Sequence, residues 1–349
     1  MPSDHPVITL HYDSRFGLAR GAVCIDGQPH LYVEGHEYNQ SLIMVNSRSV
    51  ARLKSKAGGV AFLLLADGAE AVLDVPQEGF AKLVEGTALE VEIIAEPRQE
   101  KLARARLIAP VTGEPRRISP VQSLKDRLLT RVKDWGDIVE SIVDFDALDA
   151  AEEAALNPSA PLPEGGYLSI ERTRALIACD VDSAGGEGNA TPKAFTKLCN
   201  ERAVADIGRR LRLSGLAGLV VIDLIGKRHD ADRLRQLLQA GFGSEAGKLI
   251  IGPIGKFGTL EFVRPWGATP LMDTVRSPVR AAHLLLRDAV KRAEGEPGRL
   301  LTLRAPVGTL DIIRPLLAAS HDPLSAIIRL EAAAQYAAQY AAKSEVIVT

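Results

Sequence analysis

The chain has 349 residues, 46% of them hydrophobic and 25% charged, a composition typical of globular proteins that fold as two or three domains. Its longest apolar runs, such as 60–66 and 219–222, are too short to span a bilayer, and we expect no secretory signal at the N-terminus. The formal net charge of −2 gives no overall attraction to nucleic acid, although arginine and lysine residues cluster locally.

The segment 7–110 is rich in short β-branched or alternating runs. Turn signals, among them Asp26-Gly27 and the stretch 66–68, separate these runs. Short strands at this regular spacing predict a small barrel or an open antiparallel sheet.

The segment 120–156 has a different, helical character. An acidic, alanine-rich run occupies its second half, and the Pro- and Gly-rich stretch 157–166 that follows predicts a domain boundary. Four apolar residues in its first half recur at helical spacing: Val121, Leu124, Leu128 and Val132.

Beyond this boundary, two short strands precede a helix. Residues 167–171 and 175–179 predict a β-hairpin, and a loop over 182–190 leads to the helix. Thr191 as N-cap and Pro192 at the first helical position mark where that helix begins.

Strands and helices continue to alternate to the end of the chain, which is the order of an α/β fold. The next elements are a buried strand over 219–223, a helix over 230–240 and a strand over 248–251. The tail from residue 276 adds a helix, a strand over 299–304, a second helix, an alanine-rich segment over 332–342 and a last strand over 346–348.

Two apolar strands each end in an aspartate, Asp180 and Asp223. Ligands of α/β sheets bind beyond the carboxyl ends of the strands, and neighbouring strands lie about 4.8 Å apart. If these two strands are neighbours, both carboxylates reach one hard cation such as Mg²⁺, which needs few protein ligands. Asp182 points the same way if the strand persists. The alternative is that each aspartate only caps a turn.

Such a site is suited to phosphodiester cleavage. A bound metal lowers the pKa of a water molecule, orients the attack on phosphorus and neutralises developing charge, while nearby Arg or Lys side chains hold the flanking phosphates. His229, in a basic loop after the second strand, is interpreted as a loop histidine, with a general acid or a phosphate contact as the alternatives.

Three ordered motifs in this region resemble the ribonuclease E/G family. The stretch 165–183 is similar to the family signature GG-xxxIExTEALxxIDVNS. Asn200, 209–213 and 218–223 match the helix and the strand that follow it, and 256–261 resembles the motif RFG-hLEhxR.

The resemblance implies a DNase I-like catalytic subdomain in which Asp180 and Asp223 bind Mg²⁺, with Mn²⁺ as the alternative ion. Asp182 occupies a position where better-known members have Asn, and a carboxylate there adds charge that alters metal stoichiometry or affinity.

The resemblance extends more weakly to the N-terminal half. Residues 21–33 are similar to the opening strands of a ribonuclease H-like subdomain, and 50–107 looks like an S1 domain, an OB-type barrel that holds single-stranded RNA. Phe62 matches an RNA-stacking aromatic, with a core residue as the alternative, and Lys101 lies near the family's basic segment. Val72 is aliphatic where a second aromatic is expected.

Two features of larger family members are not expected here. The stretch between the S1-like region and Gly165 is too short for a sensor of RNA 5′ ends. No cysteine follows Trp266, so we expect no zinc link between subunits, and any homo-oligomer is not joined by zinc. The three cysteines, Cys24, Cys179 and Cys199, form no CxxC pair, which favours a reducing, cytoplasmic setting.

The sequence therefore predicts a cytoplasmic, Mg²⁺-dependent endoribonuclease with single-stranded RNA as partner and no membrane association. The alternatives are a non-catalytic RNA-binding protein and a nuclease that cleaves DNA. Predicted RNA contacts are Phe62, Lys101, Arg209, Arg212, Lys256 and Arg264. The predicted architecture is mixed α+β and α/β: 1–47 ribonuclease H-like strands, 48–112 S1-like barrel, 113–163 helical connector, 164–270 DNase I-like catalytic subdomain and 271–349 α/β segment.

Overall fold

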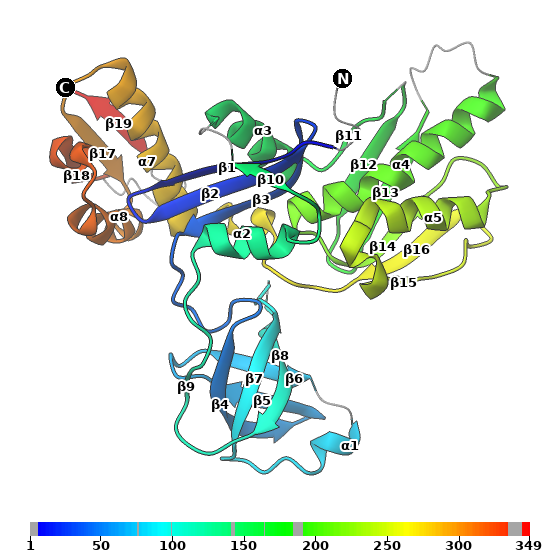
Figure 1. The fold of residues 1–349 in the computed structure, drawn as a ribbon, viewed down its shortest axis with the longest axis horizontal. Coiled ribbons are helices and arrows are strands. Elements are labelled where there is room, and N and C mark those ends of the chain that lie inside the picture. Colours follow the sequence, from blue (N-terminus) through cyan, green and yellow to red (C-terminus); the bar gives the residue numbers. More distant parts are fainter. Residues whose placement is uncertain are drawn as a thin grey trace.

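The computed structural model describes residues 6–74, 77–98, 100–140, 144–163, 165–183, 191–333 and 344–349. Most of the loop predicted over 182–190 and of the alanine-rich segment predicted over 332–342 lies outside the described residues. Figure 1 shows a small barrel set apart from an elongated body that contains three further sheets. None of the described helices is long and apolar enough to cross a membrane.

The first sheet has the strand order β10-β1-β2-β3. One face packs against Leu124, Leu128 and Val132 of one helix, and the other face packs against Leu148 and Ala151 of a second helix. The elements are β1 (Ile8–Arg15), β2 (Leu18–Ile25), β3 (Gln28–His36), β10 (Ile138–Glu140), α2 (Leu124–Val132) and α3 (Phe145–Leu156). Helix α2 begins at Leu124 rather than near Val121, because the Ser123 side chain accepts a hydrogen bond from the amide of Asp126 as N-cap.

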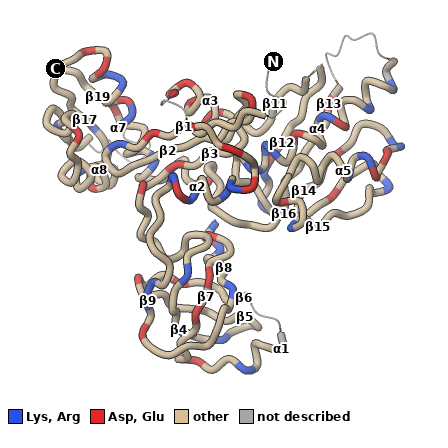
Figure 2. The backbone as a smooth tube through the Cα atoms, in the orientation of Figure 1, with Lys and Arg blue, Asp and Glu red and all other residues tan. Residues whose placement is uncertain are grey.

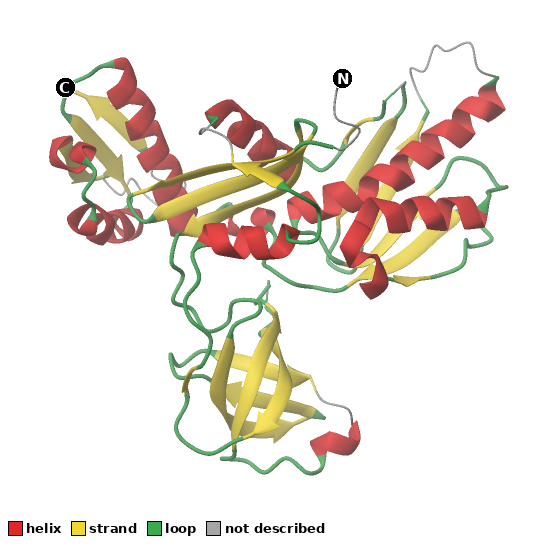
Figure 3. Cartoon of the chain, viewed as in Figure 1, coloured by secondary structure: helices red, strands yellow, loops and turns green. Residues whose placement is uncertain are grey.

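The predicted barrel is a closed, five-stranded one, which is consistent with an OB-type fold (Figure 3). Its strands follow the order β5-β6-β8-β7-β4, and the pairing of β4 with β5 closes it. Leu53, Leu63 and Ile93 are fully buried inside it. The elements are β4 (Arg48–Ala57), β5 (Val60–Leu64), β6 (Glu70–Asp74), α1 (Gln77–Phe80), β7 (Ala88–Ala95) and β8 (Ala103–Pro110), with the short β9 (Arg116–Arg117) paired to β4.

A mixed six-stranded sheet, with the order β11-β12-β13-β14-β16-β15, forms the largest unit. Its strands are β11 (Ala160–Pro161), β12 (Tyr167–Arg172), β13 (Ile177–Asp182), β14 (Gly218–Asp223), β15 (Ile250–Ile251) and β16 (Thr259–Arg264). Its helices are α4 (Pro192–Ser214), α5 (Ala231–Phe242) and the 3-10 helix η1 (Gly243–Lys248).

Helices α4 and α5 cover one face of this six-stranded sheet (Figure 1). Helix α4 begins as predicted, with Thr191 as N-cap and a proline in the first turn, and Gly215 ends it at φ 72°. Its buried face meets the apolar side chains of β13 and β14. The six-stranded sheet therefore has one face that α4 and α5 cover. The opposite face, which these helices do not cover, is called the open face below.

The C-terminal part is a three-stranded sheet of order β18-β17-β19. Strand β18 is absent from the sequence prediction, because its alternating residues run directly into an alanine-rich segment that favours helix. The elements are α6 (Leu271–Thr274), α7 (Pro278–Gly295), β17 (Leu301–Ala305), α8 (Val307–Ala319), η2 (Pro323–Ile327), β18 (Ile328–Ala332) and β19 (Glu345–Val348).

Candidate metal centre

Asp180 and Asp223 lie directly beside each other on neighbouring strands. Strands β13 and β14 are parallel, and Asp180 is the register partner of Asp223. Register partners point to the same side of a sheet, and adjacent strands are about 4.8 Å apart. The two carboxylates therefore project from equivalent points of one face.

That face is the open one. Cys179 and Ile222, the residues just before the two aspartates, are buried against the helices, whereas Asp180 and Asp223 are exposed. Because side chains alternate along a strand, the aspartates face solvent on the side opposite α4 and α5. Their register partners on the outer strands are Ser169 of β12 and Thr259 of β16, so a row of four oxygen-bearing side chains crosses the sheet.

Asp182 lies two residues beyond Asp180 on β13, opposite Tyr167 of β12. The strand persists to this residue, so the same alternation places Asp182 on the open face as well. Its exposed carboxylate adds a third negative charge to this end of the sheet.

The donor set suits a divalent ion that retains much of its water. The described residues contain no group of three or more His, Cys, Asp or Glu side chains that could hold a metal ion. Mg²⁺ is commonly bound through only one or two carboxylates, with water completing its octahedral shell. The exposed pair Asp180 and Asp223 matches that requirement, with Asp182 as a further oxygen donor nearby.

Asn200 is a positioning residue whose role was not predicted. It lies on α4, is 4% exposed, and donates from Nδ2 to the carbonyl of Ile225 at 3.0 Å. Its Oδ1 accepts from the amide of the same residue, also at 3.0 Å. A single buried amide thus fixes the backbone just after Asp223. The motif match named Asn200, but only the fold reveals which backbone it holds.

Three of the predicted phosphate contacts are instead buried within the protein. Arg209 pairs with Asp206 and donates to the carbonyl of Pro29. Arg264 donates to Glu245 through two nitrogens and to the carbonyls of Leu211 and Leu216. Their guanidinium groups serve internal contacts, which does not support the predicted role in binding phosphate.

Arg212 is the third of these. It is 7% exposed, lies over the ring of Trp135 at 5.1 Å, and donates to the carbonyl of Gly241 at 3.3 Å. Burial lowers the pKa of Arg212 to about 10, and the pKa of the neighbouring His30 is lowered to about 4 by burial and then by this guanidinium. We therefore leave Arg209, Arg212 and Arg264 out of the RNA contacts.

The remaining predicted contacts lie on the surface. Lys256 is exposed in the turn before β16, and Lys101 is exposed just before β8. Phe62 is half-buried on the outer side of the barrel, between the buried Ala61 and Leu63, so it is not a core residue. Its register partner on β6 is Val72, the aliphatic residue noted in the sequence.

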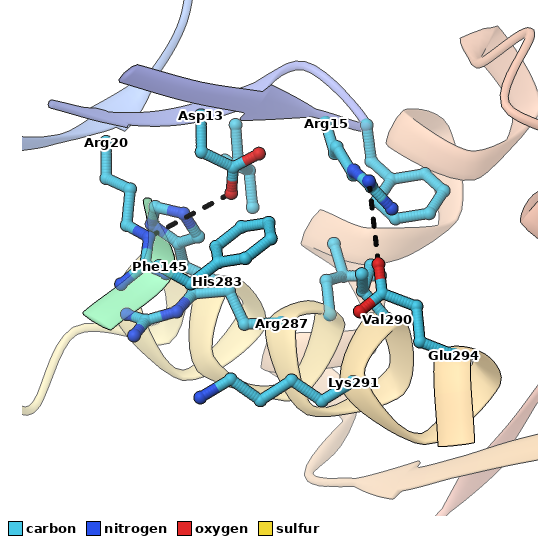
Figure 4. A pocket seen from close by; sticks show the side chains of 12 residues that line it. Asp13, Arg15, Arg20, Phe145, His283, Arg287, Val290, Lys291 and Glu294 are labelled. Carbon is cyan, nitrogen blue, oxygen red and sulfur yellow. Dashed lines mark ion pairs between the residues drawn. The ribbon is translucent and has the colours of Figure 1, made fainter. Parts of the chain in front are cut away.

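Lys and Arg positions alternate with Asp and Glu positions along the backbone in the view of Figure 2. A compact ionic cluster lies between β2, α3 and α7, where Arg20 pairs with Asp149 at 2.5 Å and Arg287 pairs with Glu152 at 2.6 Å. A cavity lined by Asp13, Arg20 and His283 adjoins this cluster (Figure 4). This cavity is not part of the sheet that carries Asp180 and Asp223. Charged side chains that line it pair with one another, as Arg20 does with Asp13 and Arg15 with Glu294.

Comparison with known proteins identifies the region that contains the aspartates. Residues 116–266 match the ribonuclease E/G family. Ribonuclease E of Nostoc sp. is 32% identical over 125 residues, which are 35% of this chain and 18% of that protein. Ribonuclease E of Escherichia coli is 34% identical over 125 residues, which are 34% of this chain and 11% of that protein.

A chloroplastic ribonuclease E/G-like protein of Arabidopsis thaliana is 25% identical over 146 residues, which are 40% of this chain and 14% of that protein. The matched part of the chain thus spans less than a fifth of the length of these relatives. The match includes Asp180, Asn200 and Asp223. The chain is therefore similar to the ribonuclease E/G family over residues 116–266, which are 151 of its 349 residues.

Proposed function

We propose that this protein is a Mg²⁺-dependent endoribonuclease that cleaves single-stranded RNA beside Asp180 and Asp223. The observation that carries the proposal is the register pairing of the two aspartates on the open face of the six-stranded sheet. The similarity of residues 116–266 to the ribonuclease E/G family supports an RNA substrate. The three cysteines are free and buried, which fits a reducing cytoplasm as the place of action.

The roles of the residues follow from this geometry. Asp180 and Asp223 would hold the divalent ion, and Asp182 would ligate it or orient one of its waters. When bound, Mg²⁺ supplies a water of lowered pKa and neutralises negative charge in the transition state. Lys256, at the same end of the sheet, holds a flanking phosphate. The oxygen of a water would form a bond to phosphorus while one bridging P–O bond of the diester breaks. One proton of that water would end on the released hydroxyl and the other on the new phosphate monoester or in solvent.

The open face also provides a path from the barrel to the aspartates. The turn between β7 and β8 contacts the chain after β16: the amide of Glu96 donates to the carbonyl of Gly267 at 2.9 Å, and Arg98 lies over Trp266 at 4.1 Å. This contact is at the end of β14 and β16 opposite Asp223. Six strand residues, about 20 Å, separate the two ends.

The barrel contributes the second half of the RNA-binding surface in this proposal. Phe62, Val72 and Arg104 are register neighbours on β5, β6 and β8. An aromatic beside an exposed cation suits a base and its phosphate. Arg104 pairs with Asp74 at 2.6 Å and would exchange this exposed carboxylate for the phosphate. Val72 has no aromatic ring on which a base could stack. We therefore expect this surface to bind RNA with lower affinity than a pair of aromatic side chains would. Lys101 precedes β8 and extends this basic edge.

The test is cleavage of matched RNA and DNA single strands, with and without Mg²⁺. We expect the RNA to be cut only with Mg²⁺, and Asp223→Asn to slow cleavage on the order of 10²-fold or more. Asp146→Asn, the same change at an exposed site on α3, is the control and should retain the wild-type rate. Because Asp223 is exposed, its substitution should change the free energy of unfolding by less than about 0.5 kcal/mol.

Each other outcome assigns a different function. RNA binding by the wild-type protein without any cleavage would support the non-catalytic RNA-binding protein. Equal cutting of both strands would indicate a nuclease that does not recognise the 2′-hydroxyl. Cleavage that survives Asp223→Asn would remove the proposed mechanism.

A further inference from the structure

Phe257 is the most exposed large hydrophobic side chain among the described residues, with 91% of its surface accessible. It lies in a tight turn between β15 and β16. The amide of Gly258 donates to the carbonyl of Gly255 at 3.0 Å, and the amide of Gly255 donates to the carbonyl of Thr259 at 2.8 Å. Exposure of one apolar side chain does not by itself indicate a ligand. The position of this ring, on a hydrogen-bonded turn beside the two aspartates, is what suits it to contact a substrate.

The turn packs against the backbone that directly follows Asp223. Gly258 has φ +89°, and a Cβ on it would lie 2.8 Å from the carbonyl oxygen of Gly226. The amide of Leu224 donates to the carbonyl of Gly258 at 3.3 Å. Thr259, two residues after Phe257, is the register partner of Asp223. One strand spacing and two residues of chain keep Phe257 within roughly 12 Å of Asp223.

The same edge bears cations that have no acidic partner among the described residues. Lys256 is in the turn itself, and Lys227 and Arg228 are in the loop that packs against it. All three are exposed, and none forms an ion pair with a described residue. An exposed ring flanked by unpaired cations matches the surface that proteins offer to single-stranded nucleic acid, where rings stack on bases and cations hold phosphates.

We propose that Phe257 is a base-stacking platform that holds one nucleobase of a single-stranded RNA next to the Asp180–Asp223 pair, with Lys256 on the adjoining phosphate. The proposal rests on the RNA substrate named above. A protein partner is the competing occupant of an exposed ring. RNA is favoured for two reasons. The neighbouring cations can hold phosphates, and the ring lies within one or two nucleotides of the proposed cleavage point.

The experiment measures binding, not cleavage. Fluorescence anisotropy with a labelled RNA single strand in EDTA compares the wild-type protein with Phe257→Ala, Phe257→Leu and Phe257→Trp. Stacking on one base predicts that Phe257→Ala weakens affinity roughly 5- to 100-fold. Phe257→Trp should restore affinity, whereas Phe257→Leu should not. Tyr38→Ala removes another exposed aromatic, on the loop after β3, and should leave affinity unchanged.

A second readout reports the stack itself. 2-Aminopurine placed in the RNA should lose emission on binding to the wild-type protein and to Phe257→Trp, but not on binding to Phe257→Ala. Wild-type affinity in Phe257→Ala, or full affinity in Phe257→Leu, would overturn the proposal. Failure of the proposed enzyme is a separate result, namely stacking in EDTA without any cleavage after Mg²⁺ is added.

Discussion

At the scale of single residues, exposure separates side chains that face a substrate from those that hold the fold. The aspartates and Lys256 are exposed, whereas Arg209 and Arg212 of α4 and Arg264 of β16 are buried among carbonyls and carboxylates. The sequence revealed the basic residues but not their surroundings, because a helix with arginines on several sides does not show which side is covered.

Arg264 and Lys256 should therefore respond in opposite ways to substitution by alanine. Arg264→Ala leaves Glu245 and two backbone carbonyls without their donor, and we expect it to lower the free energy of unfolding by about 3 kcal/mol. Lys256→Ala should change that free energy by less than about 0.5 kcal/mol. Urea denaturation measures both.

RNA binding should show the reverse pattern. Lys256→Ala should weaken binding and reduce the slope of log affinity against log salt by about 0.7, as expected for one lost phosphate contact on a single strand. Folded Arg264→Ala should keep the wild-type slope. A reduced slope in Arg264→Ala, with none in Lys256→Ala, would reverse our assignment of the two residues.

At the scale of elements, chain order and strand ends were predictable, and detailed packing was not. The N-cap at Thr191 and the strand ending at Asp223 follow from local signals that act within a few residues. The parallel pairing that brings Asp180 to Asp223 depends on contacts across the sheet. From the sequence, a shared metal site required the two strands to be neighbours. The fold shows that they are.

The crossing of α4 and α5 provides an element-scale prediction. A Cβ at Gly208 would lie 2.5 Å from the carbonyl carbon and oxygen of Gly241, so the two helix backbones nearly touch there. We expect Gly208→Ala to force the helices apart and to lower the free energy of unfolding by about 1–3 kcal/mol. Gly247→Ala is the matched control, because no atom lies within 4 Å of a Cβ at that glycine. Equal stability of the two variants would contradict the close crossing.

At the scale of the whole molecule, the barrel contacts the segment that follows the six-stranded sheet. The contacts of Glu96 and Arg98 with residues 266–269 join them, and the amide of Thr269 donates to the carboxylate of Glu96 at 2.9 Å. Sequence patterns indicated the barrel and the α/β unit separately. They could not indicate this contact, because the residues that form it are about 170 positions apart.

The proposed cleavage mechanism requires Asp180 and Asp223 to bind a divalent ion. Titration of the protein with Mn²⁺, followed by electron paramagnetic resonance of the free ion, measures this directly. We predict saturable binding in the wild-type protein and in Asp146→Asn, and its loss in Asp180→Asn and in Asp223→Asn. Unchanged Mn²⁺ binding in both of the last two variants would contradict the account.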